Sequence, residues 1–289
     1  MVKPLPKRVR GAELSNIFKE SLCILNGAPE GLGGKMMNFI IGLVAGIFGG
    51  LVGLGGGVIM IPLMVGVLKL TQHQAHGTSL VALVFTGLAG AITYAMKGSV
   101  DLTASALLAV TAIFTARFGA RFAHSLPEWK LKRSFGGFLI FVSILLLLKP
   151  YLAQVAHPVS DVGAKIFVLL LTGVFTGFLS GMMGVGGGTI MVPSMVLLAG
   201  MGQHMAQGSS LLAMVPAGAV GAHAHWKLGN VVTKLLAGLI PGIFIGTYFG
   251  GSLALVLSEA VLRAIFAAVL IWTGVRYLRT KAPKAQSGI

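Results

Sequence analysis

Two glycine-rich stretches are the parts of this sequence best suited to bind a small ligand through the main chain. The first, from Gly53 to Pro62, reads GLGGGVIMIP, and the second, from Gly184 to Pro193, reads GVGGGTIMVP. Three consecutive glycines are unfavourable inside a helix, by about 1 kcal/mol each relative to alanine, and proline suits the first turn of a helix. We therefore predict a helix, an unwound stretch, and a short second helix that begins near each proline.

An unwound stretch of this kind can bind an anion. Its unpaired N–H groups and the positive end of the following helix dipole both favour negative charge. The predicted substrate-binding backbone donors are Gly55, Gly56, Gly57, Gly186, Gly187 and Gly188, with Thr189 beside them. The alternative interpretation is a structural kink that lets helices cross closely. A dinucleotide-binding fingerprint is excluded, because no strand–helix–strand unit surrounds the glycines.

Polar residues follow each glycine stretch at matching positions. A new helix is expected to start at each Gln-His pair, and one turn later come hydroxyl groups, which can donate to a ligand oxygen or to a carbonyl one turn back. The predicted substrate-binding side chains are Gln72, Thr78, Ser79, Gln203, Ser209 and Ser210. His73 and His204 are the candidates for proton coupling, and the alternative for both is a helix-end residue at the membrane interface.

The acidic residues all lie outside the apolar segments: Glu13, Glu20, Glu30, Asp101, Glu128, Asp161 and Glu259. Cation carriers place ionisable residues within the membrane, so a cation would find no carboxylate partner here, and an anion fits better. No nucleophile–base pair, phosphate loop or metal-ligand cluster is visible, and the chain has a single cysteine. We therefore predict no catalytic residue, no metal and no cofactor. Trp226 and Lys227, beside His223 and His225 at the end of the sixth apolar segment, are interpreted as interfacial anchors.

The composition indicates a protein of the lipid bilayer. Of 289 residues, 55% are hydrophobic and 10% are charged, and the mean hydropathy is +0.90, whereas an average soluble domain is roughly a quarter charged. The 22 basic residues would suggest nucleic acid in a soluble protein. Here they lie in tails and short loops, so we interpret them as topology markers and predict no nucleic-acid partner. The basic start of the chain lacks the pattern of a cleaved signal peptide.

The predicted fold is an all-α polytopic membrane protein. A membrane-spanning helix needs about 20 apolar residues, and eight stretches provide them: 37–70, 75–96, 101–122, 134–155, 166–199, 205–226, 231–257 and 260–278. The first and the fifth are too long for one simple crossing and contain the glycine stretches. We therefore expect about eight transmembrane segments, the first and fifth of them broken.

The two halves of the chain are a tandem duplication. A shift of 131 residues aligns them without a gap, with about 25 of 59 positions identical from Gly42 to Val100. Internal repeats are a recurring feature of secondary transporters. The predicted organisation is a basic tail, a first transmembrane repeat, a loop, a second repeat and a C-terminal tail, at residues 1–35, 36–155, 156–167, 168–280 and 281–289.

The distribution of Lys and Arg distinguishes two topologies. If each long segment crosses once, the repeats are parallel, with about 15 basic residues inside and about 7 outside. If each returns as a broken hairpin, the repeats are inverted, and the numbers become about 18 and 4. The positive-inside rule favours the second arrangement, which brings both glycine breaks toward the midplane. We predict inverted repeats with a cytoplasmic N-terminus in a bacterial inner membrane.

Both halves resemble the sulfite exporter TauE/SafE family. The resemblance rests on the GxGGGxxxxP segments at Gly53–Pro62 and Gly184–Pro193 and on the Ala-x-Gly-(Thr/Ser)-Ser-Leu segments that start at Ala75 and Ala206, and it covers about residues 37 to 280. It implies movement of sulfite and organosulfonates across the bacterial cytoplasmic membrane. The site residues above come from the physical reasoning and not from the family.

The predicted function is a secondary transporter of a small anion by alternating access, most simply a sulfur oxyanion or organosulfonate. The predicted partners are this solute and the lipid bilayer, and a homo-oligomer is left open. Two other functions remain. An anion channel would need a continuous pore, and a non-transporting membrane scaffold would need the glycines only for folding.

Overall fold

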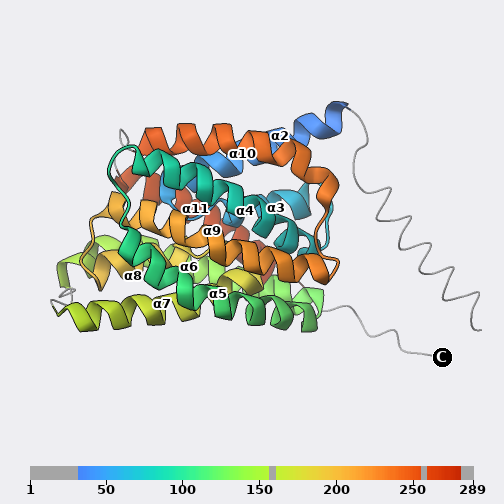
Figure 1. Ribbon diagram of the computed structural model, residues 1–289. Helices are drawn as coiled ribbons and strands as arrows, with labels where there is room; N and C mark the ends of the chain where they lie inside the picture. Colours follow the sequence, from blue (N-terminus) through green and yellow to red (C-terminus); the bar gives the residue numbers. More distant parts are fainter. Residues whose placement is uncertain (1–31, 156–160, 255–258, 281–289) are drawn as a thin grey trace, which may run out of the picture.

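The computed structural model describes residues 32–155, 161–254 and 259–280, and over these residues the protein is helical without strands (Figure 1). Most of the predicted N-terminal tail, part of the inter-repeat loop and nearly all of the C-terminal tail lie outside the described residues. The ten helices of the described part are α2 (Leu32–Val52), α3 (Gly57–Gly66), α4 (Gln72–Ala95), α5 (Leu102–Ser125), α6 (Glu128–Val155), α7 (Val162–Met183), α8 (Gly188–Leu197), α9 (Gln203–Lys227), α10 (Thr233–Ala254) and α11 (Glu259–Leu278).

Five of these helices are long and apolar enough to cross a membrane. The qualifying stretches are Gly34–Val52, Gln72–Ala95, Leu102–Ser125, Val162–Met183 and Thr233–Ala254. They belong to α2, α4, α5, α7 and α10. The protein is therefore a helical membrane protein, as its composition predicts.

Both glycine stretches interrupt the helices, as the sequence predicts. The first break lies between α2 and α3, and the second lies between α7 and α8. The backbone has a positive φ at Gly53, Gly55, Gly56, Gly184 and Gly186. Glycine adopts this left-handed conformation at little cost, whereas a residue with a side chain rarely does. The repeated glycines are therefore what allows the chain to leave the helix at these two places.

The short helices begin earlier than predicted. α3 starts at Gly57 rather than near Pro62, and α8 starts at Gly188 rather than near Pro193. The Gly56 carbonyl already accepts hydrogen bonds from the chain that follows it. Buried backbone groups need hydrogen-bond partners, so the apolar residues before each proline are helical too. The proline then costs a single bond inside the short helix.

Glycines spaced four apart bring α2 and α10 into backbone contact. A Cβ at Gly42 would meet the Leu239 carbonyl oxygen, and a Cβ at Gly46 would lie 2.7 Å from that of Ile243. The contacts advance in the same direction along both helices, so α2 and α10 are parallel and lie side by side (Figure 1). Small residues permit such close approach in membranes.

The α5–α7 pair repeats this arrangement. Gly173 of α7 faces Leu108 of α5, and Gly181 faces Ala116, again in parallel. Under the 131-residue shift α7 corresponds to α2, and α5 corresponds to α10. The first helix of each half therefore packs against the third long helix of the other half. The two halves are thus interleaved.

Corresponding helices of the two halves run in opposite directions where they meet. A Cβ at Gly87 of α4 would lie 2.8 Å from the Leu211 carbonyl oxygen near the start of α9, and one at Gly221, near the end of α9, would lie 3.4 Å from a Leu80 methyl group. α4 and α9 are therefore antiparallel. α6 and α11 are antiparallel as well, since Gly136 contacts Gly274 and Ser143 donates to the Ala267 carbonyl at 3.4 Å.

α2 and α4 run in the same direction, and α3 returns between them. The Phe85 ring of α4 lies 6.1 Å from the Phe244 ring of α10, and a Cβ at Gly251, further along α10, would lie 3.0 Å from the Thr93 methyl group. α4 is thus parallel to α10, which is parallel to α2. The chain enters as α2, turns at the glycine break, comes back as α3 and re-enters as α4.

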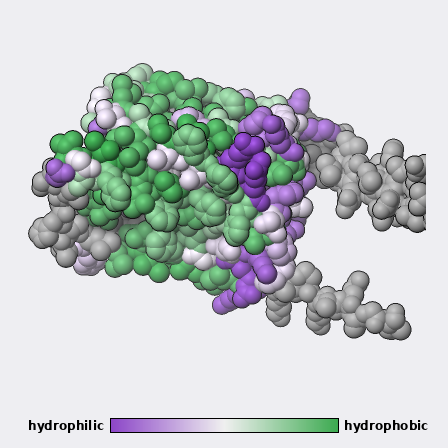
Figure 2. All heavy atoms as spheres, turned by 60° about the horizontal axis from the view of Figure 1, so that its bottom comes forward, coloured by the Kyte–Doolittle hydropathy of each residue, from purple (hydrophilic) through white to green (hydrophobic). Residues whose placement is uncertain are grey.

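Charged side chains gather at one end of the helix bundle, which we call the basic end. Here α4 starts beside the start of α6, since Glu128 accepts from the Gln72 N–H at 3.2 Å, and α5 ends beside the α9–α10 connection, since Asn230 contacts His124. Figure 2 shows hydrophilic residues concentrated at one end and hydrophobic residues over most of the remaining face. The basic end includes Lys69, Arg117, Arg121, Lys130, Lys132, Arg133, Lys227 and Arg276.

The glycine-mediated contact of α2 with α10 predicts a specific sensitivity to a single methyl group. A Cβ at Gly242 would meet the Phe39 carbonyl oxygen, whereas a Cβ at Gly137 of α6 would meet nothing within 4 Å. Gly242→Ala should lower the free energy of unfolding by about 1–3 kcal/mol through overpacking. Gly137→Ala should leave it unchanged or raise it by up to about 1 kcal/mol through helix propensity. Thermal unfolding of the two detergent-purified variants tests this, and equal melting temperatures would contradict it.

Candidate functional site

The two glycine breaks meet in the interior of the bundle. A Cβ at Gly57 would lie 2.6 Å from the Gly184 carbonyl oxygen, and a Cβ at Gly188 would meet the Gly53 carbonyl oxygen. Both breaks are buried along their whole length. Stretches that are far apart in the sequence thus form one continuous feature, with the two short helices α3 and α8 starting from it.

Side chains of α4 and α9 satisfy the carbonyl groups that α2 leaves open at the first break. The Tyr94 hydroxyl donates to the Gly50 carbonyl at 2.9 Å and the Ser210 hydroxyl to the Gly53 carbonyl at 2.9 Å. Between them, the Gln207 amide donates to the Leu51 carbonyl at 3.3 Å. The last carbonyls of a helix have no partner within it, so these three donors stabilise the open helix end.

The second break is satisfied in the same way. His225 donates to the Gly181 carbonyl at 2.9 Å, His76 to the Met182 carbonyl at 3.1 Å and Ser79 to the Gly184 carbonyl at 2.6 Å. Each acceptor is the 131-residue counterpart of an acceptor at the first break. The donors correspond too, but their chemistry differs: histidine replaces tyrosine at one position and glutamine at another.

Some N–H groups of the breaks are left without partners, whereas those of Gly53, Gly57 and Gly184 donate to the carbonyls of Gly49, Gly55 and Ser180. Among the described residues, no hydrogen bond is made by the backbone N–H of Gly55, Gly56, Gly186 or Gly187. Each pair directly precedes the N-terminus of a short helix, where further N–H groups and the positive end of the dipole lie. A buried N–H without a partner costs free energy, so a ligand with acceptor oxygens would be stabilised here.

Two apolar side chains lie against the central glycines. A Cβ at Gly55 would lie 2.6 Å from Leu83 Cδ2, and a Cβ at Gly186 would lie 2.8 Å from Met214 Sδ. Leu83 of α4 and Met214 of α9 are counterparts under the shift and are both buried. In this conformation the free N–H groups are therefore enclosed by protein, and a solute can reach them only if these side chains move.

The hydroxyl residues predicted from the sequence are divided between two roles. Ser79 and Ser210 reach the breaks, where they donate to carbonyls. Thr78 accepts from the Val232 N–H at 3.0 Å, and Ser209 accepts from the Asp101 N–H at 2.8 Å. These two hydroxyls therefore hold the connections that precede α10 and α5.

The remaining predicted residues lie around the breaks at different distances. Thr189 is buried in the first turn of α8. Gln72 is buried at the start of α4, where its side-chain nitrogen lies 2.7 Å from His76 Nε2, and Gln203 begins α9. His73 donates to the Ala123 and Leu126 carbonyls at the basic end, each at 3.1 Å.

His204 lies at the start of α9, and its Nδ1 is buried without a partner among the described residues. Because α4 and α9 are antiparallel, His73 and His204 belong to opposite ends of the bundle. The structure therefore does not bring these two histidines together with each other or with the glycines.

Four polar residues at the breaks were not among the predicted site residues: His76, Tyr94, Gln207 and His225. All are buried, and each contacts a carbonyl or another capping residue at a break. The sequence signal was the presence of polar side chains at matching positions inside two apolar segments. His225 in particular is not part of an interfacial anchor, because its ring donates to Gly181 in the interior.

Comparison with known proteins identifies the group of sequences to which these features belong. The family described as sulfite exporter TauE/SafE matches residues 38–277. The "Probable membrane transporter protein YunE" of Bacillus subtilis is 28% identical over 256 residues, covering 81% of this chain and 94% of that protein. A "Probable membrane transporter protein" of Xylella fastidiosa is 29% identical over 237 residues, covering 80% and 88%. No solved structure matches the chain.

The carbonyl capping predicts that removing one hydroxyl destabilises the fold. Ser79→Ala leaves the buried Gly184 carbonyl without its donor, which should cost about 1–3 kcal/mol of unfolding free energy. Ser125→Ala is the matched control, because its hydroxyl is exposed and bonds within its own helix; its effect should stay within about 0.5 kcal/mol. Thermal unfolding in detergent measures both, and a stable Ser79→Ala protein would contradict the assigned role.

Proposed function

This chain belongs to the sulfite exporter TauE/SafE family, and we propose that it is a secondary transporter that moves sulfite or an organosulfonate across the membrane by alternating access. The observation that carries the proposal is the different treatment of carbonyl and N–H groups at the paired breaks. Side chains occupy the open carbonyls there, while N–H groups of both breaks stay free. The feature therefore presents donors to a ligand, and donors select an anion.

The proposed substrate-binding groups are the free N–H groups and the polar side chains beside them. Gly55, Gly56, Gly186 and Gly187 would donate to the oxygens of the anion, and the N-termini of α3 and α8 would favour its charge. Gly188 and Thr189 lie in the first turn of α8 and complete the site, and Gly57 begins α3, where its N–H donates to the Gly55 carbonyl at 2.9 Å. Sulfite and sulfonate groups each carry three oxygens, which suits several donors converging from two sides.

The proposed membrane arrangement consists of inverted repeats with about eight transmembrane segments. The antiparallel packing of α4 on α9 and of α6 on α11 supports it, as does the return of α3 between two helices of the same direction. Inverted repeats let a transporter open toward each side by exchanging the conformations of its halves. By the positive-inside rule, the basic end is cytoplasmic, and the membrane is the bacterial inner membrane.

One backbone difference between the halves supports such an exchange. Gly56 is left-handed, with φ at 69°, whereas its counterpart Gly187 has φ at −81°, an ordinary helical value. If transport exchanges the conformations of the two breaks, Gly187 must become left-handed while Gly56 becomes right-handed. Glycine adopts both conformations at little cost, whereas the left-handed one is costly for any residue with a Cβ.

This exchange predicts a folded but slow Gly187→Ala variant. In the present conformation the added Cβ would meet side-chain atoms and no backbone: the flexible end of Met191, and the Thr176 methyl group, which must rotate away. A left-handed alanine costs roughly 1–2 kcal/mol, so flux of sulfite or sulfoacetate into proteoliposomes should fall about tenfold. Gly66→Ala is the matched control, because its Cβ would meet nothing within 4 Å, and it should retain full flux.

Flux measurements, together with electrical recordings, distinguish the transporter from an anion channel and from a non-transporting scaffold. Saturation at low turnover supports a carrier, whereas conductance resolved in single events identifies an anion channel. A well-folded protein that moves none of sulfite, sulfate, thiosulfate, sulfoacetate or taurine would instead be a scaffold. Full flux through well-folded Gly187→Ala would refute the proposed site.

We also propose that His73 or His204 couples a proton to the anion. Each lies near one end of the bundle, at the first turn of α4 or α9, where a proton could be exchanged with water. The double variant His73→Gln, His204→Gln should flatten the pH dependence of flux, because glutamine cannot take up and release a proton as histidine does. An unchanged pH profile would exclude coupling through these two side chains.

A further inference from the structure

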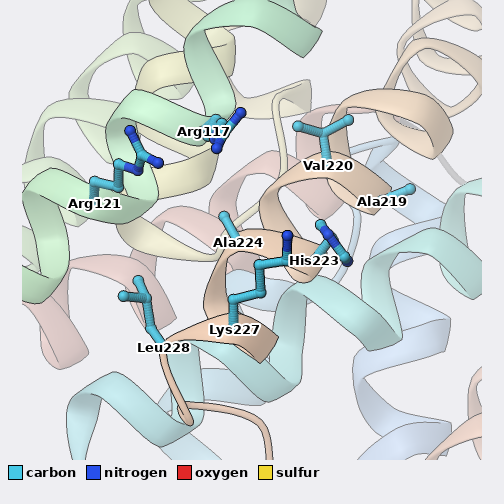
Figure 3. Close-up of a pocket in the computed structure, with 8 residues that line it drawn as sticks. All are labelled: Arg117, Arg121, Ala219, Val220, His223, Ala224, Lys227 and Leu228. Carbon is cyan, nitrogen blue, oxygen red and sulfur yellow. The ribbon is translucent and has the colours of Figure 1, made fainter.

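A groove with a volume of about 400 Å³ lies between α5 and α9 at the basic end. Arg117 and Arg121 line it from α5, and His223 and Lys227 line it from α9. Figure 3 shows the two arginines across the groove from the other pair, with the Lys227 amino group turned toward His223. Each pair is spaced by four residues, so its members share one face of their helix.

The groove concentrates positive charge without a counter-charge. The single ion pair among the described residues joins Lys132 to Glu128, so neither arginine nor Lys227 is paired with a carboxylate there. Arg117 lies about two turns before the end of α5 and therefore about 12 Å along the helix from it. The four side chains of the groove are all exposed, so the groove is open to an anion from outside the bundle.

The other half of the protein has no equivalent of this charge. The 131-residue counterparts of Arg117, Arg121, His223 and Lys227 are Tyr248, Ser252, Ile92 and Met96. The neighbouring packing glycines are repeated, by contrast: Gly119 corresponds to Gly250, and both meet a backbone carbonyl of the facing helix. The close helix packing is therefore common to both halves, whereas the four basic side chains occur at one of the two equivalent places only.

The groove adjoins the second glycine break. Ala116, next to Arg117 in the chain, packs against Gly181, and His225, next to the groove residue Ala224, donates to the Gly181 carbonyl. Gly181 lies three residues before Gly184, where that break begins. Residues next to the groove residues on α5 and α9 thus contact the end of α7, which leads into the second break.

We propose that the α5–α9 groove binds a free sulfonate or sulfite anion at the basic end and delivers it to the second glycine break. Arginine guanidinium groups match two oxygens of such an anion at once, and the lysine and histidine add donors from the opposite wall. The binding site is inferred from the groove itself, whereas its role as the access site to the translocation pathway rests on the proposed transport function.

The test uses the double variant Arg117→Gln, Arg121→Gln and a charge-matched control. In the control, Lys130→Gln, Arg133→Gln, the same number of charges is removed at the same end, from side chains that lie over the Trp129 ring and outside the groove. Equilibrium dialysis with radiolabelled sulfoacetate measures binding to the full-length protein in nanodiscs. Flux is measured in everted and right-side-out membrane vesicles.

The groove variant should bind sulfoacetate at least about tenfold more weakly than the control. Its KM should rise by a similar factor when solute is supplied from the basic end, and by much less from the other end. The loss of flux should be larger at low than at saturating solute. Arg117→Lys, Arg121→Lys should recover part of the binding, because the charge is kept while the fork geometry is lost.

Three results decide the matter. Wild-type affinity and KM in the groove variant would overturn the proposal while leaving the transport function intact. Weakened binding in a protein that transports nothing would support the binding site and refute the transport function. The third result concerns lipid. If anionic phospholipid displaces sulfoacetate from the wild type, and if the wild type in zwitterionic nanodiscs binds sulfoacetate no better than the variant does, the groove holds a lipid headgroup and the proposal fails.

Discussion

The requirement that buried backbone groups find hydrogen-bond partners governs this structure. Two helices end in the interior of the bundle, where lipid and protein exclude water, and their last carbonyls would be left open there. Tyr94, Gln207 and Ser210 satisfy one end, and His76, Ser79 and His225 satisfy the other. All six come from α4 and α9, so this antiparallel pair is the support on which both breaks depend. The free N–H groups are what remains, and they give the breaks their chemistry.

Much of this arrangement could be predicted from the sequence, because its causes are local or repeated. The glycine runs indicate the places where the helices break, since glycine adopts the positive φ seen at Gly53 and Gly184 at little cost. The spacing of Gly42 and Gly46 indicates close helix packing, and the duplication shows that this packing and the glycine breaks occur twice. The short helices start earlier than the prolines predict. The need of buried N–H and C=O groups for hydrogen-bond partners outweighs the preference of proline for the first turn of a helix.

Partners across long sequence distances could not be predicted. Ser79 and Thr78 are adjacent in the sequence, yet one caps a carbonyl of α7 and the other holds the connection before α10. Nothing local distinguishes them, because the difference arises from which helices pack against α4. Leu83 and Met214 were unremarkable apolar residues until the fold placed them against the central glycines. The duplication conserves packing better than chemistry, as the replacement of Tyr94 by His225 illustrates.

The interleaving of the halves has a consequence for how the protein is made. α2 finds its closest backbone partner in α10, so the glycine face around Gly42 must wait for Leu239 to emerge from the ribosome. The first half is therefore inserted into the lipid before the glycine face of α2 has a partner. The α5–α7 pair is complete in the growing chain before the α2–α10 pair is. Neither half contains the parallel partner of its own first helix, so a gene cut between them would give two products that gain these contacts only by associating.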